Sequence, residues 1–415
     1  MQAYSPSLRS VQKGDLCSGC GLCAGISDGA VELELAPPGF LRPQQIAPLD
    51  ASQERLIARA CPGLRVAPWF EPTEPPRGDS PRKVHFAWGP YREVLTGHAL
   101  EHEVRFVGSS GGMLTALAQH ALREDLVDAI VSVKGGDGAD PLANRVTVTE
   151  NADETLQAAG SRYGPSGPLV AVGELLNDKR RFLFVGKPCD VSALRQLAKE
   201  DPRVDEQFPF MLSFFCGGMP SRGGSEAVVS AMGLRPDELS YFRYRGNGWP
   251  GKARAETRDG QSAEMDYETS WGAHLSKHVQ FRCKICPDAV GGVADIACAD
   301  AWYGGEKGYP SFEDREGRSL VMVRTEAGAR LLEGALSRET VTVEPLAIEE
   351  IDLMQPSQRR RKTLISARRA AMAVAFLPQP DFSGLLVGNA AKHAPLQDRA
   401  RNFLGTLSRI FRGKR

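Results

Sequence analysis

The cysteines of this chain stand where a metal or redox site would require them, and they limit the folds that the chain can adopt. Cys17, Cys20 and Cys23 form a C-x2-C-x2-C run, and Cys61 follows later, directly before a proline. Three thiolates at this spacing can reach one cubic cluster from a single tight loop, and a fourth cysteine followed by proline is the usual closing ligand of a [4Fe-4S] site. Glycines between the cysteines let the backbone approach the sulfurs closely. The pattern predicts a module for electron transfer.

The distance to the fourth cysteine leaves a second interpretation open. Cys23 and Cys61 are separated by 37 residues, whereas a bacterial ferredoxin run closes with C-x3-C-P. The fourth ligand must therefore return from a separate segment. Zinc is the alternative, because paired C-x2-C units also build four-cysteine zinc sites. The strict spacing of the first three cysteines favours iron–sulfur over zinc.

Four further cysteines predict a second thiolate site. Cys189 and Cys216 each directly follow a strand-like run, and Cys283 and Cys286 form a C-x2-C pair. Since α/β folds build their sites at the carboxyl ends of strands, we expect these four side chains to meet there. The ninth cysteine, Cys298, is interpreted as a small buried apolar residue, as free cysteines often are.

Length and composition allow a folded protein of two or three domains, since the chain has 415 residues and 42% of them are hydrophobic. The first residues contain no apolar segment of a signal peptide, and no apolar run approaches the ~18 residues of a spanning helix. We therefore expect a cytoplasmic protein, in which cysteines serve metal or redox chemistry rather than disulfides.

The C-terminal segment is strongly basic although the whole chain has a net charge of zero. Residues 359–415 carry 13 Lys and Arg but only Asp381 and Asp398 as acids, a net charge of +11, so the rest of the chain carries −11. The pattern over 396–412 predicts a basic amphipathic helix, which can lie on the inner face of an anionic membrane or pack on the body or a partner. Nucleic-acid binding would rest on this segment alone and is not expected.

The order of segments predicts an α/β fold, with α+β as the alternative: a mixed-sheet body follows a ferredoxin-like half-module and precedes a helical extension. Runs typical of buried strands alternate with helical runs between Val84 and about Arg330. Residues 1–13 are expected to be unstructured. The expected strands include 129–133, 182–185, 210–215 and 319–324, and the expected helices include 112–123 and 191–200. The predicted units are 1–65 (iron–sulfur module), 66–82 (linker), 83–165 and 166–330 (two parts of the body) and 331–415 (basic helical extension).

A glycine- and serine-rich turn at 108–112 (GSSGG) precedes an apolar helix. Backbone N–H groups at a helix N-terminus opened by Gly and Ser can bind an anion, and a dinucleotide pyrophosphate would suit them. An ordinary Ser-capped helix is the alternative, because the spacing is not G-x-G-x-x-G. The loops 161–166 and 244–251 would line a flavin or substrate pocket, or form surface turns. No G-x-S-x-G or H-E-x-x-H motif supports a hydrolase.

In sequence order, these segments resemble the beta-subunit family of coenzyme F420 hydrogenase and dehydrogenase. The matching pieces run from Cys17 to Trp302 and are CSGCGLC with the later ACPG, RFVGSSGGMLTAL, GSRYGPS, VGKPCD, FFCGG, RGNGWPG and CKICPD with ADIACADAW. The resemblance implies an α/β fold with FAD, bound by residues 83–165, and two [4Fe-4S] clusters, the second within 166–330. The basic extension after Arg359 is similar to that of bacterial members associated with polysaccharide biosynthesis.

The resemblance also assigns roles residue by residue. The two clusters would be bound by Cys17, Cys20, Cys23 and Cys61 and by Cys189, Cys216, Cys283 and Cys286. FAD would contact Ser109, Ser110, Gly111, Gly112, Thr115, Ser161, Tyr163 and Asn247. The candidates for catalysis are Lys187, Tyr163 and Trp249. Lys187 and Asp190 depart from the G-T-P-C-Q of many members, and we expect Lys187 to raise the local potential through its positive charge.

These observations predict an oxidoreductase in which FAD exchanges a hydride with an organic molecule and passes single electrons to clusters. Its electron-transfer partner would be a ferredoxin-like protein or a reduced deazaflavin such as F420, and its substrate would be a small organic molecule. The alternative is a non-catalytic metal-binding protein that supports polysaccharide biosynthesis at the membrane surface.

Overall fold

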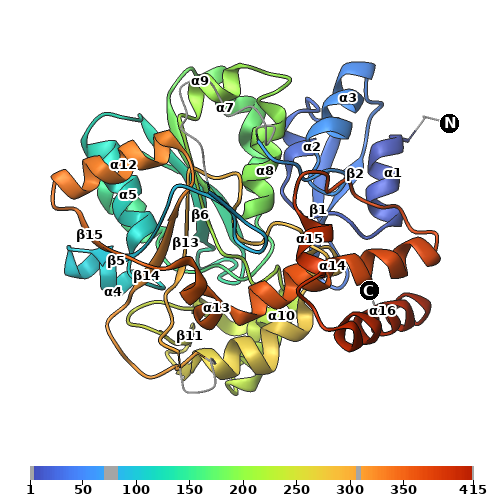
Figure 1. The fold of residues 1–415 in the computed structure, drawn as a ribbon. Coiled ribbons are helices and arrows are strands. Elements are labelled where there is room, and N and C mark those ends of the chain that lie inside the picture. Colours follow the sequence, from blue (N-terminus) through green and yellow to red (C-terminus); the bar gives the residue numbers. More distant parts are fainter. Residues whose placement is uncertain (1–3, 70–82, 305–309, 414–415) are drawn as a thin grey trace.

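A mixed eight-stranded sheet forms the centre of the molecule (Figure 1). The computed structural model describes residues 4–69, 83–304 and 310–413. The strand order is β15-β5-β14-β13-β9-β8-β6-β7. The strands are β5 (Glu93–Ala99), β6 (Ala129–Gly135), β7 (Asn144–Thr149), β8 (Phe182–Gly186), β9 (Phe210–Phe214), β13 (Ile296–Asp300), β14 (Ser319–Val323) and β15 (Val341–Pro345). The four central strands β13, β9, β8 and β6 are parallel, and both edges are antiparallel. The predicted mixed-sheet α/β fold is confirmed.

Alternate residues of the parallel strands face two separate cores. Leu183 and Leu212 pack with α5 and α12 on one face of the sheet, whereas Phe184 and Met211 pack with α7 and α8 on the other. Because both faces are covered, these strands are apolar throughout, which is why they stand out in the sequence. The covering helices are α5 (Met113–Arg123), α7 (Val172–Asp178), α8 (Pro188–Leu197) and α12 (Glu326–Ser337).

Asp295 ties these layers together just before β13. Its buried carboxylate accepts hydrogen bonds from the Arg195 guanidinium on α8 at 2.9 Å, the Met211 backbone N–H at 2.6 Å and the Thr325 hydroxyl at the N-cap of α12 at 2.6 Å. Asp205 lies 3.9 Å from the same guanidinium, but its side chain is 54% exposed. Losing Asp295 would therefore leave a buried charge without its main partner.

The N-terminal module packs on the α8 face of the sheet, where Leu22 and Ala60 belong to the same core as α8. Its elements are α1 (Pro6–Lys13), α2 (Leu22–Gly25), β1 (Val31–Ala36), β2 (Phe40–Gln45) and α3 (Ala51–Ala60). The expectation that residues 1–13 are unstructured is wrong for α1. The Ser5 hydroxyl caps this helix by accepting from the Leu8 N–H, and Leu8 and Val11 are buried. Two buried apolar residues one turn apart are too weak a pattern to be recognised in the sequence.

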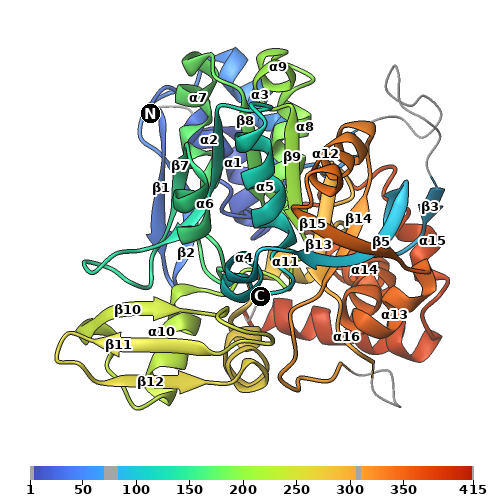
Figure 2. The ribbon, with the colours of Figure 1, turned by 90° about the vertical axis from the view of Figure 1, so that its left-hand side faces the viewer.

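A smaller antiparallel sheet with one helix lies below the main sheet in Figure 2. Val228 and Val229 of the helix pack against Leu239 and Ala255 of this sheet. Its elements are α10 (Arg222–Ala231), β10 (Leu239–Arg243), β11 (Ala253–Thr257) and β12 (Ser262–Met265), followed by η3 (Glu268–His274), η4 (Leu275–His278) and α11 (Phe281–Lys284). Other short elements are β3 (Lys83–His85), β4 (Gly89–Tyr91), α4 (His102–Val107), α6 (Ala152–Gln157), η1 (Pro168–Ala171), α9 (Arg203–Gln207) and η2 (Pro236–Glu238).

The segment predicted as a basic helical extension contributes a strand as well as helices. β15 pairs with β5 at the edge of the main sheet. The helices are η5 (Ile348–Glu350), α13 (Ile351–Met354), α14 (Pro356–Val374), α15 (Val387–Ala391) and α16 (Leu396–Phe411). α16 is joined to α14 by a 3.2 Å hydrogen bond from Arg368 to Asn402, and it leaves Leu396 75% and Phe411 74% exposed. The membrane contact stays a prediction; within the described ranges, no helix has the length and apolar character to cross a bilayer.

The predicted boundary between the two parts of the body runs through one continuous sheet. β5, β6 and β7 come from 83–165 and β8, β9, β13 and β14 from 166–330, yet all belong to one sheet. Val66 and Ala67, at the start of the predicted linker, are both 2% exposed, and the Val66 N–H donates to the Asp381 carbonyl at 2.9 Å. The rest of that linker, from 70 to 82, lies outside the described residues.

Replacing Asp295 with Ala should lower the free energy of unfolding by about 3–5 kcal/mol, because Arg195 would keep a buried charge without its partner. The matched control Asp205→Ala removes the exposed acid on the same guanidinium and should cost only about 0–1 kcal/mol. Urea denaturation followed by circular dichroism measures both. Equal losses in the two variants would contradict the central role of Asp295.

Candidate functional site

The first cysteine set lies on one loop and one helix end of the N-terminal module. The turn into α2 and the C-cap of α3 carry four free thiols, Cys17, Cys20, Cys23 and Cys61. Gly21 in this turn has φ 89°, and a Cβ there would come within 2.7 Å of the Val170 side chain. Only glycine allows this turn, because both the left-handed backbone and the close approach exclude a side chain.

Burial is the main influence on these thiols. It raises the pKa of all four, to about 11 for Cys61. The charge of Arg42 opposes the increase at Cys17, and the charge of Arg282 opposes it at both Cys17 and Cys61. Thiolates at these buried positions therefore need a positive group beside them, and a metal centre is such a group.

The second cysteine set lines one cavity at the carboxyl edge of the parallel strands. The segments after β8 and β9 provide Cys189 and Cys216, and α11 with the turn after it provides Cys283 and Cys286. All four line the cavity together with Lys187, Gln280 and Arg361. The Met219 backbone N–H donates to the Cys283 sulfur at 3.3 Å. The structure thus brings together the four cysteines that the sequence grouped.

The two cysteine sets are neighbours. Ser18, which stands between Cys17 and Cys20, lines the second cavity, and its buried hydroxyl has no hydrogen-bond partner among the described residues. Gln280 links the two sides, because its amide nitrogen lies 3.4 Å from the Ser18 carbonyl oxygen and 3.6 Å from the Cys283 sulfur. Arg282 adds a second link by donating to the Pro62 carbonyl oxygen at 2.6 Å.

Lys187 belongs to the second cavity and forms a buried ion pair there. Its Nζ lies 2.7 Å from the Asp190 carboxylate and donates to the Ser166 hydroxyl at 3.2 Å. Burial would lower the pKa of Lys187, but the charges of Asp190 and Cys189 raise it overall. Because Asp190 offsets the charge of Lys187, we expect the pair to change the local potential less than Lys187 alone would.

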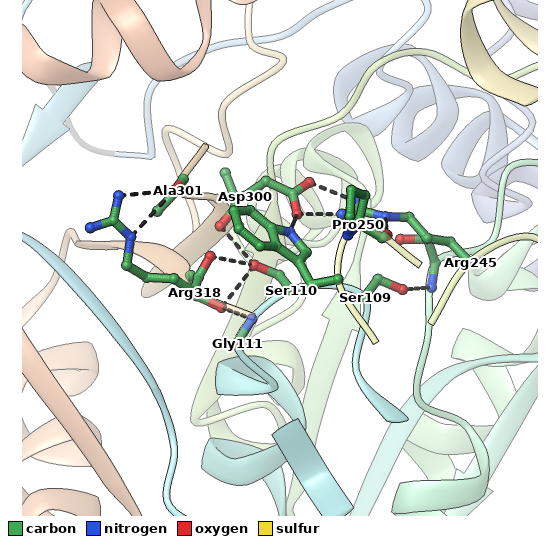
Figure 3. Close-up of polar contacts among 12 residues, drawn as sticks. Ser109, Ser110, Gly111, Arg245, Pro250, Asp300, Ala301 and Arg318 are labelled. Carbon is green, nitrogen blue, oxygen red and sulfur yellow. Dashed lines mark hydrogen bonds and ion pairs between the residues drawn. The ribbon is translucent and has the colours of Figure 1, made fainter. Parts of the chain in front are cut away.

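The turn before α5 excludes the alternative of an ordinary Ser-capped helix. Gly112 is the N-cap residue, with φ 72° and no side-chain cap. Figure 3 shows how the turn is held: the Ser110 hydroxyl donates to the Arg318 carbonyl oxygen at 2.9 Å, and the Gly111 N–H donates to the Ser319 hydroxyl at 2.9 Å. Two of the predicted FAD contacts therefore also fix the turn against β14.

The loop 161–166 connects this turn to the second cavity. At its start, the Ser161 N–H donates to the Ser109 hydroxyl at 2.5 Å. At its end, Ser166 accepts the hydrogen bond from Lys187. Tyr163 in between contacts the Tyr244 and Trp271 rings, with centroids 5.6 and 4.9 Å away. The loop thus connects the predicted flavin residues to the predicted cluster residues through a hydrogen bond at each of its ends.

Trp249 lies in a buried aromatic and ionic cluster. Asp300 accepts from both terminal nitrogens of the Arg245 guanidinium, at 2.8 and 2.7 Å, and from the Trp249 indole N–H at 2.7 Å. The Trp249 ring stacks on Trp302 at 4.7 Å, and Arg245 lies over the Tyr267 ring at 4.5 Å. Trp249 is therefore held rigidly at the carboxyl end of β13.

Two guanidinium groups without acidic partners lie near the same turn. Arg243 donates to the carbonyl oxygen of Val107, directly before the turn, at 2.5 Å. Burial lowers the pKa of Arg162, and the charge of Arg243 lowers it further. In the described part of the chain, neither guanidinium has a carboxylate at ion-pair distance, and Arg162 Nε is buried without a hydrogen bond. The arrangement would suit an anion.

The remaining predicted residues lie at different depths. Thr115 is half-buried in the first turn of α5, and Asn247 is exposed with φ 57°. Cys298 is 4% exposed in β13 and packs in the core against α5 and α12, as expected. Within the described ranges, no group of three or more His, Cys, Asp or Glu side chains is arranged to hold a metal ion. The ligand roles of the eight cysteines therefore stay predictions.

Sequence reasoning missed Gln280, Asp300, Tyr267 and Arg361. Asp300 ends a strand and precedes Ala-Trp, so its position at the carboxyl end of β13 was a usable signal. Gln280 directly precedes the segment that carries the C-x2-C pair, but nothing in the sequence relates it to Ser18. Arg361 lies 75 residues after Cys286 in a basic run, and only the fold brings it to the cavity.

Comparisons with known proteins agree with this arrangement. Two family models match the chain. The model of the coenzyme F420 hydrogenase/dehydrogenase beta subunit N-terminal part matches residues 94–172, and the model of the C-terminal part matches residues 179–349. The F420-dependent formate dehydrogenase subunit beta of Methanocaldococcus jannaschii is 27% identical over 51% of this chain and 54% of its own length. The chain thus spans about half of that relative.

Coverage of another relative is nearly complete. The coenzyme F420 hydrogenase subunit beta of Methanothermobacter thermautotrophicus is 23% identical over 70% of this chain and 99% of its own length. A chain of the solved F420-reducing [NiFe] hydrogenase complex from Methanosarcina barkeri has the same fold, with a TM-score of 0.51, 21% identity and coverage of 68% of this chain and 93% of its own. Since both parts of one family match in order across the sheet and the two loops of the site, the chain belongs to the coenzyme F420 hydrogenase/dehydrogenase beta-subunit family.

Proposed function

We propose that this protein is an oxidoreductase subunit that moves electrons between a reduced carrier and a small organic molecule through FAD and two [4Fe-4S] clusters. The carrier would be a deazaflavin of the F420 type or a ferredoxin-like protein. The relatives named above are subunits of F420-dependent formate dehydrogenase and F420 hydrogenase. Their names favour an electron-transfer role over the non-catalytic alternative.

The two adjacent sets of buried or partly buried thiols are the observation that carries this proposal. Each set supplies the four cysteines that a [4Fe-4S] cluster requires. Burial raises the pKa of Cys20, Cys61, Cys189 and Cys216, so unliganded thiolates would be costly there. Bound clusters would supply one-electron transfer, and the cysteines, with the N–H groups directed at them, would set the potentials.

Contact between the two sets supports electron transfer from one site to the other. The Gln280 amide contacts both the Ser18 carbonyl oxygen and the Cys283 sulfur, and Phe281 and Ile285 pack in one apolar cluster with Cys17. The two sites are therefore separated mainly by the side chains of the segment 280–286. The burial of Gln280, Phe281 and Ile285 would keep water away from the path.

The turn before α5, the loop 161–166 and two arginines support a flavin site beside the second set. Arg162 and Arg243 have no acidic partner in the described residues and would suit the pyrophosphate of FAD. A flavin bound there would supply hydride exchange with an organic molecule and transfer of single electrons to clusters. Tyr163, Trp249 and Lys187 are the candidates for contact with the reacting molecules, and the first two are held by rigid aromatic packing.

Replacing Cys216 with Ser should remove about half of the iron and acid-labile sulfide of the anaerobically purified protein, because one of two four-iron clusters loses a ligand. Cys298→Ser is the matched control, since Cys298 is buried in the neighbouring strand but belongs to neither set. Metal analysis should give about eight irons per wild-type chain and per control chain.

Other results would contradict the proposal. Zinc in place of iron, in a colourless protein without flavin, would support the non-catalytic metal-binding alternative. Iron that is unchanged in Cys216→Ser would exclude the second set as a cluster site. Failure of F420, ferredoxin and NAD(P)H to reduce the bound flavin would exclude the proposed carriers.

Replacing Arg162 or Arg243 with Gln should weaken FAD binding about 10- to 100-fold, which corresponds to losing one charged hydrogen bond of about 1.5–3 kcal/mol. Arg254→Gln is the control, because Arg254 is exposed on β11 and already paired with Glu256 at 2.7 Å. Titration of flavin-free protein with FAD, followed by flavin fluorescence, measures the dissociation constants. Unchanged affinity in both variants would place the pyrophosphate elsewhere.

A further inference from the structure

The helix α14 lies on the second cysteine cavity although it is outside the regions that match the family, which end at residue 349. The Gln358 amide donates to the Cys216 carbonyl oxygen at 2.9 Å. The Arg361 guanidinium donates to the same oxygen at 3.1 Å and to the Gly217 carbonyl oxygen at 2.6 Å. Three hydrogen bonds from one helix therefore hold the loop that carries Cys216.

The same face of α14 also holds the segment that carries the C-x2-C pair. Lys362 donates to the carbonyl oxygen of Pro287, next to Cys286, and Arg368 donates to the carbonyl oxygen of Lys284, next to Cys283. Side chains at positions 358, 361, 362 and 368 share one face of a helix. α14 thus bridges the two segments that supply three of the four thiols.

Arg361 brings an unpaired positive charge to the cavity. It lines the cavity with the four cysteines, and among the described residues no carboxylate lies at ion-pair distance from its guanidinium. Lys187, which also lines the cavity, is paired with Asp190 at 2.7 Å. Asp288 also lines the cavity, but its carboxylate accepts hydrogen bonds from backbone N–H groups of the segment that follows it. A negative group bound in the cavity would therefore be a partner for Arg361.

We propose that Arg361 is a positioning residue of the second cluster site, and that the C-terminal extension tunes this site through it. The inference rests on the proposed function. The carbonyl hydrogen bonds of Arg361 fix the Cys216 loop, and its charge stabilises the more negative, reduced form of a cluster that four thiolates bind. Net charge and hydrogen bonding are among the factors that set cluster potentials. The C-terminal extension is then a structural part of the second cluster site and not a separate tail.

Arg361→Gln tests this proposal in the full-length protein. Removing the positive charge should make reduction of the second cluster at least tenfold less favourable, a shift of about 59 mV to more negative potential for one electron. Arg361→Lys keeps the charge and should recover most of the potential. Arg360→Gln, an identical change at the adjacent exposed position of α14, should shift the potential much less. Anaerobic redox titrations monitored by electron paramagnetic resonance measure all three variants.

The possible outcomes separate the two proposals. If Arg361→Gln lost about four irons and Arg361→Lys kept them, the charge of Arg361 would be required for the second cluster to bind at all, which would support the inference. Equal shifts in Arg361→Gln and Arg360→Gln, or no shift in either, would overturn it while leaving the proposed function intact. A wild-type protein with only about four irons, all of them lost in Cys61→Ser, would instead refute the second cluster itself.

Discussion

The placement of eight thiols, buried or partly buried, in two neighbouring sets is the constraint on which the rest of this structure depends. Burial raises the pKa of Cys20, Cys189 and Cys216, so their ionised forms need positive groups and hydrogen-bond donors nearby. Arg42 and Arg282 act at the first set, and Arg361 acts at the second. Arg42 comes from β2 of the N-terminal module, Arg282 from α11 and Arg361 from α14. Segments that are far apart in the sequence therefore supply the positive charges around the sulfurs.

The main sheet explains why the second set forms where it does. β8 and β9 are parallel neighbours, so the segments after them, which carry Cys189 and Cys216, meet at one edge. The segment around α11 contacts both cysteine sets. It does so because Gln280 and Arg282 bond to backbone oxygens of the first module, while Cys283 and Cys286 point into the cavity.

Much of the fold was predictable from local pattern. The strands at 182–185 and 210–215 and the helix at 112–123 lie within one or two residues of their expected positions, because doubly covered strands are continuously apolar. The helix α1 was missed, since its capping and two buried residues form a weak signal. The structure excludes the Ser-capped alternative for the start of α5, because the left-handed Gly112 is the N-cap residue and the serines bond to distant segments.

The sequence by itself determined the grouping of the cysteines and the alternation of strands and helices, because thiol spacing and apolar periodicity are local properties. Only the tertiary structure decided which charges face those thiols. Arg361 and Gln280 are remote from the cysteines they contact, and their roles depend on how α14 and α11 pack. Lys187 illustrates the same difference: its charge is evident in the sequence, but the burial and the Asp190 partner that offset it are consequences of the fold.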